Sequence, residues 1–344
     1  MSAYLNTRVS LFAGRLWRPG DFDAVLAVAD AGMADALAAR GLPQLAAGYD
    51  RKDHLSLEQR IIAAMLEETR VLIRPLDGAA RAFLVYWTER FEVSNLKTLL
   101  RGKMMGERPA ALLARLTPMG AFGRLDAQDL AHAEDVGELL RRLEAGHYSG
   151  IVRHARRAFE ESRDPFILDA ALDRGYHEGL AHRALPLEKE AGEPFRRLMA
   201  ALVDRINLVW LLRYRFNYHL PPAQVYFLLV GSHYRLPSAR LRELAALGSP
   251  EAVLEALPEP QRAMLRGAAG IPEVAARTEG ALAEAAARVL RADAPAIARA
   301  FAYLILRERD LRAVRAILRG RHLELAPDDI RLAMFQPVPA EGHA

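Results

Sequence analysis

Apolar residues recur every three or four positions along most of this chain, which is the spacing of one face of an α-helix. The clearest stretches of this kind are 55–72, 83–100, 198–212 and 301–318. Alternation with a period of two is scarce. The best strand-like run, 224–230, follows two prolines, and we interpret it as the start of a buried helix. Proline and glycine separate the periodic stretches into segments of ordinary helix length, so the pattern predicts an all-α protein.

One helical pattern occurs three times. An acid precedes Asn by three residues, an aliphatic residue follows the Asn, and Leu-Arg and a second base come later at fixed spacing. The matching residues are Glu92, Asn95, Leu96 and Arg101 in the first copy, Asp204, Asn207, Leu208 and Arg213 in the second, and Asp310, Val314 and Arg319 in the third. The third copy has Ala313 in place of Asn. The chain has only four asparagines, so the shared position of two of them is informative.

The repeated pattern has a structural rather than a chemical interpretation. Asn is unfavourable inside a helix because its amide competes for backbone groups, so a buried Asn needs partners on a neighbouring segment. We therefore expect the motif to build three similar helical domains, at 1–119, 120–236 and 237–344, in a roughly threefold arrangement. A weaker echo aligns Leu116-Thr-Pro118 with Leu236-Pro237 and supports a unit of about a third of the chain.

Composition and charge narrow the function classes. The 344 residues are 51% hydrophobic and 26% charged, which is typical of a folded core, and the absence of cysteine excludes disulfides and thiolate chemistry. The net charge of +4 comes from 47 bases interleaved with 43 acids, without the concentrated basic patch of a nucleic-acid binder. The N-terminus does not resemble a signal peptide, and the longest uncharged run, 216–234, contains two prolines. We expect a cytoplasmic protein without membrane insertion.

The sequence offers no recognisable catalytic, cofactor or metal site. It contains no P-loop, G-x-G-x-x-G or G-x-S-x-G motif. His177 and His182 are five residues apart, whereas a zinc-binding helix places its histidines four apart, so we interpret this string as an exposed helix start. The aromatic run from Trp210 to Tyr218 has helical spacing beside a leucine stripe and favours a place in the core or at a contact with another protein. We predict no cofactor and no enzymatic activity.

At these residues the chain resembles the C subunit of the V-type (A-type) ATPase or ATP synthase, the family that includes the d subunit of the eukaryotic vacuolar pump. The resemblance covers most of the chain. It rests on the order and spacing of five strings, at 4–9, 94–103, 168–176, 203–208 and 302–315. It implies an all-helical, funnel-shaped protein of three similar domains around a pseudo-threefold axis. It also implies a non-catalytic central-stalk protein, present as a single copy. Such a protein couples the central shaft to the membrane proteolipid ring, transmits torque in proton or sodium transport, and lies peripheral to the membrane in the cytoplasm.

If the three domains are alike, the segments that leave the three signature helices share one rim. These segments are basic, and the second is also aromatic. We predict a partner-binding rim, without assigning shaft or ring to it, at Lys103, Arg108, Arg215, Tyr218 and Arg321.

Two other interpretations stay open. The first is a helical-repeat scaffold that binds other proteins along a concave face. The second is an all-helical enzyme, which needs carboxylates or histidines that converge on a central pocket from different helices.

Overall fold

The computed structural model describes residues 2–47, 49–50 and 54–334, and every regular element within these ranges is a helix. This confirms the predicted all-α class. The first part of the chain forms α1 (Ser2–Ala13), α2 (Pro19–Ala27), η1 (Asp30–Gly32), α3 (Met33–Ala39), α4 (Pro43–Ala46), α5 (His54–Ile73) and α6 (Gly78–Met104). There follow α7 (Pro109–Arg115), η2 (Gly120–Phe122), α8 (Ala127–Ala131), α9 (Val136–Glu144) and α10 (Ser149–Ser162).

The second half contains the longest helix, α11 (Pro165–Leu212), which is followed by a π-helical turn, η3 (Arg213–Asn217). The remaining helices are α12 (Pro222–Leu228), α13 (Ser238–Ala245), α14 (Pro250–Glu255), α15 (Gln261–Leu265), α16 (Ile271–Arg291), α17 (Ala296–His322) and α18 (Pro327–Met334). The strand-like run at 224–230 falls mostly in α12, as the preceding prolines predict, because proline is favoured in the first turn of a helix. Helix α11 is kinked at Gly192, which has a φ of +62° and lies two residues before Pro194.

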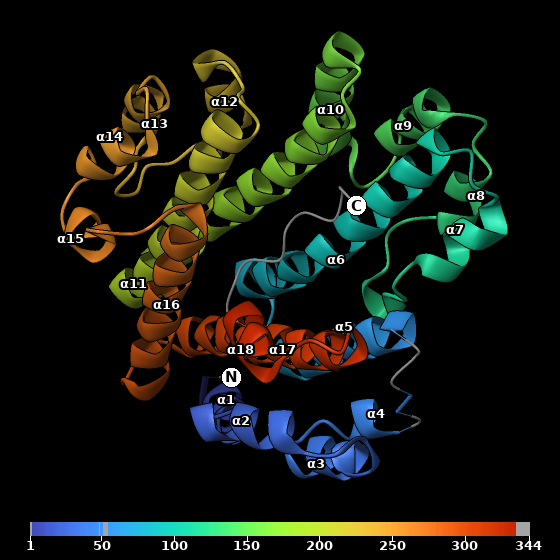
Figure 1. Cartoon of the computed structure of the whole chain (residues 1–344), viewed down its shortest axis with the longest axis vertical. Helices are drawn as coiled ribbons and strands as arrows, with labels where there is room; N and C mark the ends of the chain where they lie inside the picture. The colour runs from blue at the N-terminus through green and yellow to red at the C-terminus, as the bar shows by residue number, and fades with distance from the viewer. Residues whose placement is uncertain (1, 48, 51–53, 335–344) are drawn as a thin grey trace.

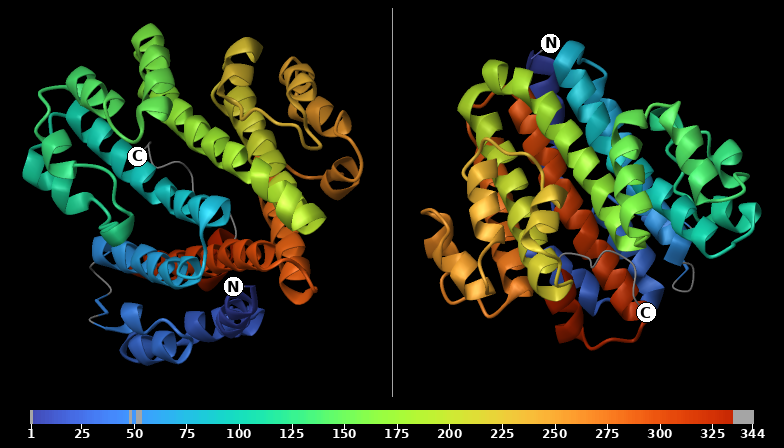
Figure 2. Two further views of the ribbon diagram at one scale, coloured as in Figure 1. Left: turned by 180° about the vertical axis from the view of Figure 1, so that it is seen from behind. Right: turned by 90° about the horizontal axis from the view of Figure 1, so that it is seen from above.

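Long helices form the middle of the molecule and short helices surround them in three groups. Figure 1 shows α6, α11, α16 and α17 inside, with α12–α15, α7–α9 and α1–α4 as outlying groups. The view from behind in Figure 2 shows the same separation. Each group follows a signature helix in the chain except α1–α4, which begin the chain and pack against α17. The three-domain funnel and its boundaries at 119 and 236 stay predictions.

Three equivalent phenylalanines meet at the centre. Phe83, Phe195 and Phe301 each precede the signature acid of their copy by nine residues. Their ring centroids lie 4.9 to 5.7 Å apart, and all three side chains are fully buried. Mutual contact between equivalent residues is what packing around a rotation axis produces. Phe83 meets the other two rings edge to face, and the Phe195 and Phe301 rings are tilted at 42° to each other. These contacts position the three long helices relative to one another.

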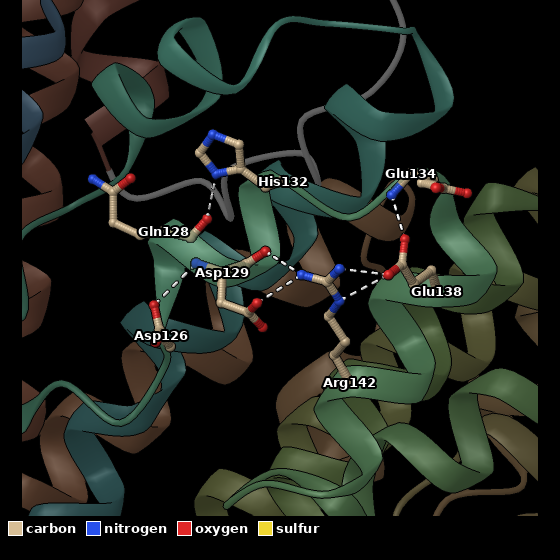
Figure 3. A network of polar contacts seen from close by, with 7 residues as sticks. All are labelled: Asp126, Gln128, Asp129, His132, Glu134, Glu138 and Arg142. Carbon is tan, nitrogen blue, oxygen red and sulfur yellow. Dashed lines mark hydrogen bonds and ion pairs between the residues drawn. The ribbon is translucent and has the colours of Figure 1, made fainter.

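Local polar contacts help to hold the outlying group α7–α9. Figure 3 shows the α8–α9 corner, where Asp126 caps α8 by accepting a hydrogen bond from the Asp129 amide at 3.0 Å. Arg142 on α9 donates to Glu138 one turn earlier and to the carbonyl and carboxylate of Asp129 at 2.7 Å. One guanidinium therefore connects the two short helices, in addition to the apolar side chains that each of them buries.

Candidate functional site: the signature helices and the pocket between them

The two signature asparagines make the same pair of hydrogen bonds. The Asn95 amide donates to the Thr117 carbonyl at 2.8 Å and accepts from the Thr117 N–H at 2.8 Å. The Asn207 amide makes both bonds with Val230, at 2.9 and 2.8 Å. Each side chain thus satisfies one residue of the loop that follows the next short helix, α7 or α12. This is the buried tie to a neighbouring segment that the sequence predicts.

The signature acids also have equivalent partners. Glu92 accepts from the Leu125 N–H at 2.8 Å, Asp204 from the Leu236 N–H at 3.1 Å and Asp310 from the Trp17 N–H at 2.9 Å. The donors have one feature in common, because each stands two residues before a helix, namely α8, α13 and α2. The weaker echo predicted from the sequence is therefore misaligned, since the hydrogen bonds pair Leu125, not Leu116, with Leu236.

In the third copy, the signature acid binds a segment from the beginning of the chain. Trp17 is 293 positions from Asp310, and its indole also donates to the Arg40 carbonyl at 3.1 Å, which holds the α2–α3 segment on α17. This bond joins a segment of the first predicted domain to a helix of the third. Ala313, in the asparagine position, is fully buried. Sequence reasoning missed Trp17, although a proline lies within two residues after both Trp17 and Leu236, at Pro19 and at Pro237.

Burial raises the pKa of the two signature aspartates. The pKa of Asp204 rises to about 6 and that of Asp310 to about 7, because both lose solvent, while the amides of Leu236 and Trp17 partly offset the effect. A carboxyl that holds a structural loop explains these shifts without catalysis. In the third copy a second buried group lies nearby: Arg307 donates to Glu68 at 3.0 Å, and Tyr303 donates to the same carboxylate at 2.6 Å.

Glycine follows the signature arginine in the first and third copies for a steric reason. A Cβ on Gly102 would lie 2.0 Å from Leu112 on α7, and one on Gly320 would lie 2.5 Å from Ile330 on α18. The two contacts have the same spacing of ten residues. The second copy has Tyr214 in the position of this glycine. There the π-helical turn η3 adds one residue to the turn of the helix. This explains why Asn207 and Val230 are 23 residues apart, whereas Asn95 and Thr117 are 22 apart.

The remaining signature residues have structural surroundings. Leu96, Leu208 and Val314 are buried in the core. Arg101 on α6 forms an ion pair with Asp169 on α11, and Lys97 pairs one turn away with Asp173. Arg319 is exposed near the end of α17, whereas Arg213 lines a pocket between the long helices.

This pocket has a volume of about 320 Å³ and lies between α6, α11, α16 and α17. We call it the arginine pocket. Its charged and aromatic lining residues are Arg90, Arg205, Arg213, Arg312, Asp173, Glu279, Glu308, His177, Tyr176, Trp87 and Trp210. Arg90 pairs with Glu308 at 2.9 Å, and Arg205 and Arg312 both pair with Glu279, at 2.6 and 2.5 Å. These pairs link all four helices around the pocket. No group of three or more His, Asp or Glu side chains in the described part of the chain is arranged to hold a metal ion.

His177 corrects one expectation. It lies inside α11 rather than at an exposed helix start, and it is half-buried against Tyr176 and Trp210. Burial lowers its pKa to about 4, and the nearby cations Lys97 and Arg90 act in the same direction, so the ring is neutral at neutral pH. The sequence spacing identified His177 and His182, but it could not show that α11 extends on both sides of them.

The residues of the predicted rim differ in their surroundings. Arg321 is tied to the chain's own N-terminal segment through the carbonyl of Leu26 at 3.2 Å and the carboxylate of Asp30 at 2.5 Å. Tyr218 stacks on Phe166 with ring centroids 4.0 Å apart. Arg215 is half-buried beside Phe216.

Lys103 and Arg108 flank the C-terminal end of α6, and Arg108 is exposed. Between them Met105 is 77% exposed, the largest value among the exposed large hydrophobic residues of the described chain. The helix end therefore presents an apolar side chain between two bases.

The fold and its ties define a class: an all-α chain whose repeated helix-and-loop unit surrounds a polar pocket. A family model described as ATP synthase (C/AC39) subunit matches residues 5–332. The chain belongs to this family, which confirms the predicted resemblance to the C subunit of the V/A-type ATPase.

Relatives in this family are divergent. A protein of Methanocaldococcus jannaschii, described as the C subunit of an A-type ATP synthase, is 25% identical over 207 residues, which is 60% of this chain and 51% of that protein. The relative of the same description in Methanothermobacter thermautotrophicus is 27% identical over 51% of this chain and 44% of its own length. This chain thus spans about half the length of these two relatives. The Haloferax volcanii protein of this description is 26% identical over 74% of both chains.

Proposed function

We propose that this chain is a non-catalytic central-stalk subunit of a V/A-type ATPase or ATP synthase, which connects the central shaft to the membrane proteolipid ring. Family membership supports the assignment to such a complex, and the relatives are described as C subunits of A-type ATP synthases. None of the described helices has both the length and the apolar character needed to cross a bilayer. We place the chain at the cytoplasmic side of the membrane, held there by its partners.

The observation that carries the proposal is the way in which the three copies are locked together. A torque-transmitting part must not deform, and close-packed interiors have low compressibility. The central phenylalanine contact holds α6, α11 and α17, and ion pairs around the arginine pocket connect the same helices to α16. The buried polar groups of the signature helices serve loops and helix contacts rather than a reacting centre.

For the partner-binding surface we select part of the rim predicted from sequence. We propose that it includes Lys103, Met105 and Arg108 at the end of α6. An exposed apolar side chain between two bases suits a mixed interface with an apolar centre and a polar edge. Arg321 is unsuitable for a binding test because its reversal would also break contacts with Leu26 and Asp30.

The test is recovery of partners from detergent-solubilised membranes of the source organism with the tagged full-length chain. We expect the shaft proteins and the proteolipid to be recovered together. The double variant Lys103→Glu/Arg108→Glu should lose most of one partner. Arg153→Glu/Arg157→Glu, which reverses two exposed arginines on α10, is the matched control and should retain both.

The outcomes separate the alternatives. Recovery of neither partner by the unmodified chain overturns the stalk assignment, and recovery of unrelated proteins would favour the helical-repeat scaffold. Normal recovery by the Lys103/Arg108 variant overturns only the proposed surface.

A further inference from the structure

The arginine pocket carries more positive than negative charge. Four arginines line it, and three carboxylates oppose them. One of these, Asp173, forms its ion pair with Lys97, which lies outside the lining. Glu279 is shared between Arg205 and Arg312, so one carboxylate neutralises two guanidinium groups. An excess of cations in a partly enclosed, low-dielectric site attracts an anion.

Several donors of the pocket lack an acceptor among the described residues. Trp87 is only 4% exposed, and its indole N–H is buried without a hydrogen-bond partner. The Nε atoms of Arg90, Arg205 and Arg312 are likewise buried without a hydrogen-bond partner. One acceptor of the pocket, the Oε2 atom of Glu279, also lacks a hydrogen bond, but it lies 2.6 Å from the Arg205 guanidinium in an ion pair. Buried donors are nearly always satisfied in folded proteins, so the remaining donors, which come from three helices, point to an acceptor-rich ligand.

Arg213 differs from its equivalent in the first copy. Arg101 forms an ion pair with Asp169, whereas Arg213 stands at the start of the π-helical turn η3 and lines the pocket. This turn ends α11, and it changes the course of the chain at Arg213 relative to the regular helix that carries Arg101 in the first copy. The change therefore brings into the pocket a guanidinium that, in the first copy, serves a helix contact.

We propose that the arginine pocket binds an oxyanion, either a carboxylate or a phosphate group, with Arg213 as its main ligand. The donors are guanidinium and indole N–H groups, and a planar guanidinium matches the geometry of both anions. The neutral His177 ring adds a polar wall without charge. The anion comes either from solution, as inorganic phosphate, or from an acidic side chain of a protein partner. The inference does not depend on the proposed stalk function, because it concerns binding by the full-length chain alone.

The experiment follows tryptophan fluorescence during titration of the full-length chain. Two of the three tryptophans, Trp87 and Trp210, line the pocket and report on its contents. One arm adds inorganic phosphate, and the other adds the capped peptide acetyl-Asp-Glu-Asp-amide. We expect saturable binding in at least one arm and about tenfold or more loss of affinity in Arg213→Gln, because a charge-assisted bidentate contact is removed. Arg213→Lys should lose less, since it keeps the charge but not the fork.

Arg153→Gln on the surface of α10 removes the same charge elsewhere and should bind like the unmodified chain. Thermal unfolding of each variant by circular dichroism establishes that it is folded. Binding of phosphate identifies a solution anion, and binding of the peptide alone identifies a partner side chain. Binding in neither arm, or binding that Arg213→Gln and Arg153→Gln weaken equally, overturns the proposal.

Discussion

The contact between the three long helices at the centre and the loops held by the signature helices differ in how closely the three copies agree. At the centre, the three copies use the same residue, and Phe83, Phe195 and Phe301 meet as equivalents. At the loop ends, two copies use an asparagine, while the third has Ala313 and relies on a segment from the start of the chain. Packing around a common point demands identical shapes. A loop, by contrast, can be held by any acceptor that satisfies its backbone.

The largest expected effect comes from breaking the centre. Phe301→Ala removes a fully buried ring that touches Phe83, Phe195 and Trp87, and should lower the free energy of unfolding by about 4 kcal/mol. Urea unfolding followed by circular dichroism measures the loss. Phe301→Leu, which keeps most of the volume, should cost much less. Equal losses in the two variants would show that the ring contacts do not define the centre.

The second prediction concerns the pH dependence of stability that the signature aspartates of the second and third copies cause. The pKa of Asp310 is raised from 3.8 to about 7, so between these values the folded chain holds a proton that the unfolded chain does not. The group therefore contributes stability that is gained as pH falls through 7 and lost as pH rises. Asp310→Asn removes this dependence and keeps an oxygen acceptor for Trp17.

Urea unfolding at pH 8 and pH 5 gives the comparison. The free energy of unfolding of the unmodified chain, relative to Asp310→Asn, should increase by roughly 2–3 kcal/mol on acidification, since one pH unit corresponds to about 1.4 kcal/mol. Asp204→Asn should show the same sign over a smaller range, because the pKa of Asp204 is about 6. A relative stability that falls on acidification would contradict the assignment.

A smaller loss is expected from removing one amide tie. Asn207→Ala leaves the buried N–H and carbonyl of Val230 unsatisfied and should cost about 2 kcal/mol. Asn95→Ala should cost less, because Asn95 is 7% exposed and Asn207 is fully buried, so water can reach the first loop more easily. Chemical denaturation of both variants checks the order. A larger cost at Asn95 would mean that burial does not set the strength of the tie.

The smallest expected loss of stability comes from the glycine that the first and third copies share after the signature arginine. Gly102→Ala places a Cβ 2.0 Å from Leu112 and should destabilise by about 1–2 kcal/mol as α7 moves away from α6. Gly280→Ala is the control, because that glycine lies in α16 with no atom within 4 Å of the new Cβ and the substitution favours the helix. Thermal unfolding should show opposite shifts for the two variants, and a stabilising Gly102→Ala would contradict the close approach.

Much of the fold could be predicted because its signals are local. The three-to-four spacing of apolar residues defines helices before any contact is known, and the repeated acid, Asn and Leu-Arg spacing located the residues that hold the loops. The partner of Asn207 could not be predicted, since the π-helical turn η3 that shifts it by one residue has no sequence signal. The contacts of Arg321 with Leu26 and Asp30 could not be predicted either, because they join parts of the chain that are far apart in sequence.

The sequence by itself determined the helices, the repeat and the family resemblance, because each is found by comparing stretches of sequence without knowing which distant segments are in contact. Only the tertiary structure decided that Trp17 closes the third copy, that the three phenylalanines meet, and that arginines from α6, α11 and α17 surround one pocket. The physical reason is that a local pattern specifies which face of a helix is buried. Which distant segment covers that face is settled when the whole chain satisfies its buried polar groups at once.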